Sequence, residues 1–273
     1  MDERIAANQR LWDRWTEINA ASPFYDVASF VDGTHGIRLR AEELADIGPV
    51  EGRTLLHLQC HFGLDTLSWA RLGAVVTGAD LSAAGVARAR QLAAEVGLPA
   101  RFVQSNLYDL PDVLDETFDI VYTSRGVITW LPDIRRWAQV VARYVRPGGM
   151  FYITEIHPVA LVFDDDGVGP GELRLRYPYW EHEESIRIEP QGSYADRTAD
   201  ASGLVEHGWD HSLGEIVTAL IDAGLVIDLL REDDFCEWPV PYLVQSEDGR
   251  WRLPPDARGQ LPLFFSLRAH KPG

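Results

Sequence analysis

Cysteine is scarce in this sequence: Cys60 and Cys236 are the only two among 273 residues. Two cysteines cannot build a disulfide framework, and neither lies at a spacing typical of metal ligands. Long apolar runs are missing as well, since no run approaches the ~20 residues that a membrane-spanning helix requires. The polar start of the chain also lacks the apolar core of a signal peptide. We therefore expect a cytoplasmic protein with no bound metal and no membrane partner.

Basic residues are also in deficit. The chain has 25 Lys and Arg against 42 Asp and Glu, which gives a net charge of −17. This field repels phosphate backbones, so we do not expect nucleic acid as a partner. It suits a neutral or cationic small substrate, although such acidity can also serve solubility alone. The length and the 46% hydrophobic content favour one globular α/β domain with insertions.

Apolar strands and helices alternate through the first half of the chain. We predict strands at 54–59, 74–79, 101–104, 118–123 and 149–155, and helices at 63–72, 82–96, 112–115 and 134–145. Such alternation is typical of a parallel sheet that helices cover on both faces. Around this core (51–157) we expect an N-terminal helical cap (1–50), a β-rich substrate-lid insertion (158–208) and a C-terminal completion of the sheet (209–273). The cap carries helices at 2–20 and 37–47, the insertion short strands at 173–179 and 185–189, and the last segment a helix at 213–223 and strands at 226–232 and 263–270.

One strand–turn–helix–strand unit carries the clearest functional signal. An apolar strand enters the turn Gln59–Gly63, a helix follows, and a second strand ends at Asp80, 21 positions after Gln59. In open α/β sheets this arrangement places an acid where it accepts hydrogen bonds from a ribose. The alternative for Asp80 is a helix cap, a role that Ser82 fits equally well.

Glycine is rare in that turn, and this decides between cofactors. A dinucleotide fingerprint needs Gly-x-Gly-x-x-Gly, whereas this turn reads Gln59-Cys-His-Phe-Gly63. Asp65, in the first turn of the helix, would repel a diphosphate. These residues disfavour a nicotinamide dinucleotide and favour a nucleoside with a cationic tail, such as S-adenosylmethionine.

Four motifs together resemble the class I S-adenosylmethionine-dependent methyltransferases, especially the bacterial small-molecule methyltransferase-domain proteins. They are the Leu-Leu-His-Leu-Gln-Cys-His-Phe-Gly-Leu-Asp turn, Val-Thr-Gly-Ala-Asp-Leu-Ser at 76–82, Phe-Asp-Ile-Val-Tyr-Thr-Ser at 118–124 and Arg-Pro-Gly-Gly-Met-Phe-Tyr-Ile at 146–153. The resemblance implies a Rossmann-like, seven-stranded, mostly parallel sheet with an antiparallel last strand. It further implies methyl transfer from S-adenosylmethionine to an O, N or C atom of a small molecule. The family's acidic-x-Gly-x-Gly-x-Gly turn here reads His57-x-Gln59-x-His61-x-Gly63, so only the last glycine is kept.

The resemblance assigns the ribose contact to Asp80 and the adenine edge to Asn106. Arg125, after the fourth strand, is expected to hold the methionine carboxylate or a substrate anion. The expected cofactor contacts are Gln59, Cys60, His61, Gly63, Asp80, Leu81, Asn106, Leu107, Ser124 and Arg125. For each polar side chain a purely structural role is the alternative.

A general base is needed only if the attacking atom carries a proton. The candidates are Glu155 and His157, at the end of the fifth strand, and His211, just before the penultimate helix. His207 and His211 are four residues apart, but Gly208 between them speaks against a shared helix face and a metal site. Aromatic residues expected to wall the acceptor pocket are Tyr25, Trp130, Tyr179 and Tyr194.

The sequence thus predicts a cytoplasmic methyltransferase acting on a small molecule. The first alternative is a non-catalytic module that binds S-adenosylmethionine, and its support is the altered glycine pattern. A nicotinamide-dependent oxidoreductase is the weaker alternative. A homodimer formed through the insertion or the front helices stays open.

Overall fold

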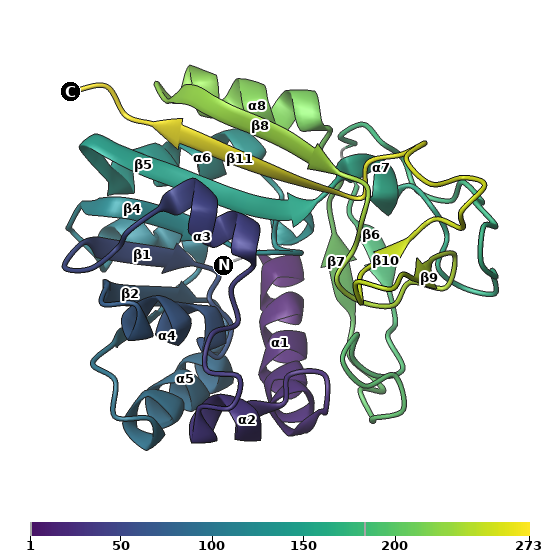
Figure 1. Cartoon of the computed structure of the whole chain (residues 1–273), viewed down its shortest axis with the longest axis horizontal. Coiled ribbons are helices and arrows are strands. Elements are labelled where there is room, and N and C mark those ends of the chain that lie inside the picture. The colour runs from purple at the N-terminus through teal and green to yellow at the C-terminus, as the bar shows by residue number, and fades with distance from the viewer. Residues whose placement is uncertain (1, 183) are drawn as a thin grey trace.

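The computed structural model describes residues 2–182 and 184–273. At its centre lies a seven-stranded sheet with the strand order β3-β2-β1-β4-β5-β11-β8 (Figure 1). Strands β1 to β5 run parallel, and β11 pairs antiparallel with both β5 and β8. The strands are β1 Thr54–Leu58, β2 Val75–Asp80, β3 Arg101–Gln104, β4 Phe118–Thr123, β5 Val145–Ile156, β8 Val226–Asp233 and β11 Phe264–His270. The predicted Rossmann-like sheet with an antiparallel last strand is confirmed.

Helices cover both faces because the buried strands are apolar on both faces. Leu56 and Leu58 face the cluster that holds Trp137, whereas Leu55, the residue before Leu56, faces the cluster that holds Trp69. Helices α3 Ala41–Ile47, α4 Leu64–Arg71 and α5 Ala83–Glu95 lie on one face of the sheet. Helices η1 Leu107–Asp112, α6 Ile134–Tyr144 and α8 Leu213–Asp222 lie on the opposite face.

Helix α1 (Glu3–Ala21) joins the sheet to the insertion. It stands beside the carboxyl ends of the strands, between the sheet and the hairpin β6 (Ile186–Ile188) and β7 (Glu206–Gly208), as Figure 1 shows. Asn8 binds the backbone of His207 twice, donating to its carbonyl and accepting from its N–H, both at 2.8 Å. Asp13 Oδ1 accepts from Ser82 Oγ at 2.6 Å and from Ala84 N at 3.0 Å. The remaining elements are α2 Val27–Asp32, η2 Ile128–Trp130, α7 Pro158–Leu161, β9 Val244–Gln245 and β10 Trp251–Arg252.

Two predicted elements are wrong in detail. The helix predicted at 112–115 is a 3-10 helix that begins at Leu107, because the Asn106 side chain caps it by accepting from Tyr108 N. The strand predicted at 173–179 is absent, since Arg174 and Arg176 both bind the Asp164 carboxylate and hold this segment as a loop. The strand predicted at 185–189 is confirmed as β6, and its partner is β7.

No helix among the described residues is long and apolar enough to cross a membrane.

Candidate active site

The turn after β1 keeps a left-handed backbone at three alternate positions. The φ angles are 56° at Gln59, 50° at His61 and 85° at Gly63. Gly63 is required, because a Cβ there would lie 2.9 Å from the Phe102 ring. Left-handed backbone costs a non-glycine residue roughly 1–2 kcal/mol. Gln59 and His61 therefore occupy positions that would be relaxed with glycine.

Asp80 ends β2 beside this turn. Its Oδ2 accepts from His61 N at 2.7 Å, and its Oδ1 accepts from Ser82 N at 2.8 Å. The side chain that caps α5 is that of Ser82, whose Oγ accepts from Gly85 N. Burial raises the pKa of Asp80 to about 6, because desolvation disfavours the ionised form. Each carboxylate oxygen retains a second lone pair for a further donor.

Other predicted cofactor residues follow the carboxyl ends of the strands next to β1 and β2. Asn106 and Leu107 follow β3, and Ser124 follows β4, where its Oγ lies 3.0 Å from His57 Nε2. His57 is buried and also bonds Thr66, so both of its ring nitrogens are paired. Cys60 is buried, and Leu81 O accepts from Gln104. The structure thus gathers these residues at one edge of the sheet.

Aromatic rings cover the turn. Trp12 of α1 lies 5.1 Å from the His61 ring and 5.0 Å from the Trp130 ring. Tyr194, from the insertion, lies 5.6 Å from Trp15, and its hydroxyl bonds that of Tyr25. Tyr25, Trp130 and Tyr194 therefore meet in one cluster with the two tryptophans of α1. Tyr179 contacts Trp180 instead, and its hydroxyl accepts from Leu213 N at the start of α8.

Arg125 lies in a buried ion network. Its guanidinium donates to Glu43 and Asp65, each at 3.3 Å, and to Glu237. The Glu43 side chain has no exposed surface, and its other oxygen accepts from the Tyr122 hydroxyl. Because three carboxylates already use this cation, it is the counterion of Glu43, which is buried, and of Asp65, which is partly buried.

Replacing Arg125 with methionine should lower the free energy of unfolding by about 3–5 kcal/mol, because it leaves buried carboxylates without a counterion. Urea unfolding at pH 7 measures this. The control is Arg143→Met, whose partner Asp115 is 97% exposed and whose loss should cost at most about 1 kcal/mol. Equal effects of the two substitutions would refute the role assigned to Arg125.

Two of the three candidate bases are fully engaged. The Glu155 carboxylate accepts from the N–H groups of Val127 at 2.8 Å, Ile128 at 3.0 Å and Ile156 at 2.6 Å, and also from Gly126. His157 Nδ1 accepts from Val159 N at 3.1 Å, and its Nε2 lies 2.9 Å from Glu232. Burial raises the pKa of Glu155 and lowers that of His157. Both side chains hold the backbone that surrounds the site.

His211 differs from these two. Its Nε2 lies 2.6 Å from the Leu131 carbonyl, so this nitrogen must carry the proton. Among the residues that the structure describes, none is a hydrogen-bond partner of the buried Nδ1. Burial lowers the pKa of His211, which keeps the ring neutral. The structure therefore presents an oriented imidazole with one free lone pair.

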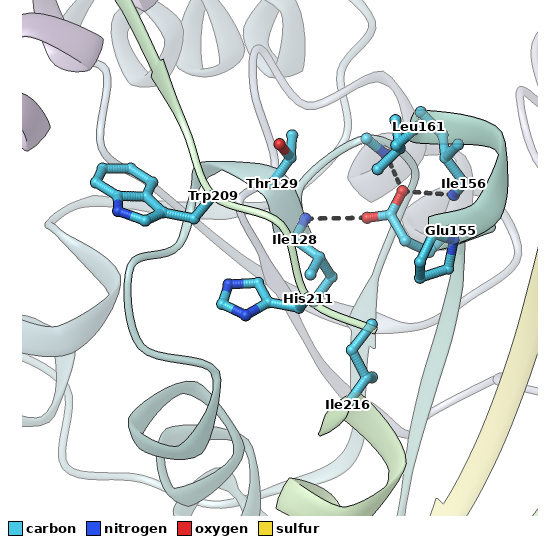
Figure 2. Close-up of a pocket in the computed structure, with 10 residues that line it drawn as sticks. Ile128, Thr129, Glu155, Ile156, Leu161, Trp209, His211 and Ile216 are labelled. Carbon is cyan, nitrogen blue, oxygen red and sulfur yellow. Dashed lines mark hydrogen bonds between the residues drawn. The ribbon is translucent and has the colours of Figure 1, made fainter. Parts of the chain in front are cut away.

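His211 lines a small cavity beside the loop that Glu155 holds (Figure 2). The enclosed room is about 10 Å³, close to what one water molecule requires. A larger molecule must therefore displace part of the lining, which is mostly apolar. The lining residues are Gly126, Ile128, Thr129, Glu155, Ile156, Pro158, Leu161, Trp209, His211 and Ile216.

Sequence reasoning missed the contributions of Asn19 and Asp13, and the cavity wall formed by Trp209. Asn19 Nδ2 lies 3.1 Å from both His61 Nε2 and the Tyr194 hydroxyl, so it joins the cap, the turn and the insertion. The sequence signal for Asn19 was its position next to Ile18, in the apolar stripe of α1. In the structure Asn19 is fully buried.

Comparisons with known proteins agree with this geometry. A family model described as "Methyltransferase domain" matches residues 56–153. A ubiquinone biosynthesis O-methyltransferase of Alkalilimnicola ehrlichii is 32% identical over 190 residues, which are 68% of this chain and 75% of that protein. The enzyme of the same name from Paracidovorax citrulli is 29% identical, with coverages of 70% and 82%.

Solved structures share the fold. An S-adenosylmethionine-dependent methyltransferase from Mesorhizobium loti superposes with a TM-score of 0.57 at 22% identity, covering 84% of this chain and 96% of that one. The glycopeptide N-methyltransferase MtfA, solved with S-adenosylmethionine, gives 0.53 at 20% identity, with coverages of 85% and 92%.

Proposed function

The chain belongs to the class I S-adenosylmethionine-dependent methyltransferases, and we propose that it methylates a proton-bearing atom, foremost a hydroxyl oxygen, of a small apolar molecule. The enzyme class and the cofactor follow from the family. The acceptor and the residue roles are our proposal. Neither alternative from the sequence, the non-catalytic module or the oxidoreductase, is favoured by the relatives.

The residues at the strand ends fit the cofactor. Asp80 has lone pairs left for both ribose hydroxyls, and Asn106 stands at the next strand end for the adenine edge. At the turn, Gln59 and His61 each have a buried polar atom that no described residue pairs with, as expected where a polar ligand completes the hydrogen bonding. When bound, S-adenosylmethionine supplies a methyl group already activated by its sulfonium.

The protein's part in the reaction is then to place the acceptor, exclude water and take up a proton. We assign the proton to Nδ1 of His211. The single observation that carries the proposal is that this buried nitrogen has no hydrogen-bond partner among the described residues, on a side chain that lines the apolar cavity. The hydrogen bond from Nε2 to the Leu131 carbonyl fixes the orientation of the ring, and in our proposal the acceptor binds against Nδ1. The apolar lining suits an apolar or aromatic body, and the O-methyltransferase names of the relatives favour oxygen as the attacking atom.

Other predicted residues take supporting roles in this proposal. Glu155 and His157 hold the loop 126–128 and the start of α7 in place. The rings of Tyr25, Trp130 and Tyr194 exclude water over the cofactor, and Tyr179 borders the acceptor from the insertion. We keep the predicted division of the chain: residues 1–50 cap the core 51–157, residues 158–208 form the substrate lid, and residues 209–273 complete the sheet. Two buried free cysteines and the charge of −17 support action in the cytoplasm on a small molecule rather than on nucleic acid.

Two measurements on the purified protein test this function. Calorimetry should show saturable binding of S-adenosylhomocysteine, the demethylated product. With radiolabelled S-adenosylmethionine, label should pass to members of a panel of phenols and catechols in preference to matched aromatic amines and to methyl ethers that lack the hydroxyl proton. Absence of product binding would refute the function, and preference for amines would refute the acceptor assignment.

A further inference from the structure

We propose that the side chains of Gln59, His61 and Asn19 hold the amino-acid end of the cofactor, so that this enzyme uses side chains at a turn where glycine would leave only backbone. The inference rests on the proposed function and names the contacts at the end of the cofactor opposite the adenine.

The backbone conformation at Gln59 and His61 is one that favours glycine, so the presence of side chains there calls for a functional reason. Among the described residues, only Asp26, Gln59 and His61 have a positive φ without being glycine. Asp26 has a local reason, because its side chain binds Ser29 and caps α2. Gln59 and His61 have no such local hydrogen bond, and glycine at either position would relax the chain.

Each of the three side chains has one polar atom that forms a hydrogen bond and one buried polar atom that forms none with the described residues. Gln59 Nε2 donates to the Val127 carbonyl at 3.0 Å, whereas the buried Oε1 has no partner within residues 2–182 and 184–273. Asn19 Nδ2 is directed to His61 Nε2 and to the Tyr194 hydroxyl, whereas the buried Asn19 Oδ1 contacts no donor in the described part of the chain. His61 Nδ1 is the third buried atom for which the described residues provide no partner. Three such atoms around one turn mark a place where a ligand supplies the missing partners.

The protonation of His61 defines what that ligand must offer. If Asn19 Nδ2 donates to His61 Nε2, the single ring proton lies on Nδ1. Burial lowers the pKa of His61 to about 3, so the ring stays neutral. The cluster then has two acceptors, Gln59 Oε1 and Asn19 Oδ1, and one donor, His61 Nδ1–H.

A zwitterionic amino acid matches this set. Its ammonium group has three donors, two of which Gln59 and Asn19 accept, and its carboxylate accepts from His61. The cluster itself is neutral, which suits a group of no net charge. Gln59 also bonds the loop that lines the acceptor cavity, so the same side chain links the cofactor's tail to the acceptor side.

Glycine substitutions separate a ligand role from a packing role. In Gln59→Gly and His61→Gly the turn already has the conformation that glycine prefers, so the melting temperature without ligand should fall by no more than about 4 °C. Calorimetry should show S-adenosylhomocysteine binding at least about 10-fold more weakly in each variant. Binding of 5′-methylthioadenosine, which keeps the nucleoside but lacks the amino-acid end, should change by less than about threefold. The control is Asp26→Gly, which relieves a positive φ away from the turn and should change neither affinity.

Unchanged or tighter binding of S-adenosylhomocysteine by both glycine variants would overturn the inference, since the side chains would then only fill space. Equal weakening of both ligands would also overturn it, because the turn itself would have changed. Failure of the wild-type protein to bind S-adenosylhomocysteine would instead refute the proposed function.

Discussion

Replacing His211 with glutamine should lower kcat by about 10²–10⁴-fold, the range expected for loss of a general base. The glutamine amide can still donate to the Leu131 carbonyl, which His211 Nε2 reaches at 2.6 Å, but it offers no basic lone pair. Affinity for S-adenosylhomocysteine should stay within about twofold, because His211 lies on the acceptor side in our proposal. Steady-state kinetics with the best phenol of the panel, alongside calorimetry, measures both quantities.

The control is His207→Gln, four residues away in β7, where the ring bonds Ser185 outside the cavity. It should leave kcat within about threefold of wild type. In the wild-type enzyme, kcat should stay level through neutral pH and fall only below the ordinary pKa of histidine, because burial lowers the pKa of His211 and the neutral ring is the active form. A rate loss under threefold in His211→Gln would show that His211 is not the base.

Replacing Asp80 with alanine should weaken binding of S-adenosylhomocysteine by about 100-fold or more. Each hydrogen bond from a ribose hydroxyl to an ionised carboxylate contributes roughly 1.5–3 kcal/mol, and two are lost. Calorimetry on the folded variant at pH 7.5 measures the change, well above the pKa of about 6 that burial gives Asp80. At that pH the wild-type carboxylate is ionised and accepts from both hydroxyls.

Asp13→Ala is the matched control for Asp80. Asp13 also binds Ser82 and the start of α5, but from α1 rather than from the end of a strand. Its loss should cost about 1 kcal/mol of stability, as the loss of a helix cap does, and change affinity by less than about threefold. Should the two alanine variants lose affinity equally, Asp80 would act only by supporting the turn.

The sheet and its carboxyl edge were predictable because their signals are local. The apolar run ending at Leu58 and the one ending at Asp80 each define a strand, and parallel pairing then places their ends together. Asp80 could be singled out for this reason. Strands at 226–232 and 263–270 were also predicted, but placing them in the same sheet required the family resemblance, since β8 and β11 lie more than a hundred residues after β4.

The rest depended on contacts between distant parts of the chain. Asn19 contacts both His61 and Tyr194, although 133 residues separate the last two. No local sequence pattern predicts a contact between such distant residues. The orientation of His211 depends on Leu131, 80 residues earlier. In the insertion the alternation at 173–179 suggested a strand, but the bonds of Arg174 and Arg176 to Asp164 override it.

A crystal structure of the protein with S-adenosylhomocysteine bears most directly on where the nucleoside lies. Our account predicts both ribose hydroxyl oxygens within about 2.6–3.0 Å of the Asp80 carboxylate, the hydrogen-bonding range for such pairs. A nucleoside bound elsewhere, with no ribose contact at the end of β2, would contradict it.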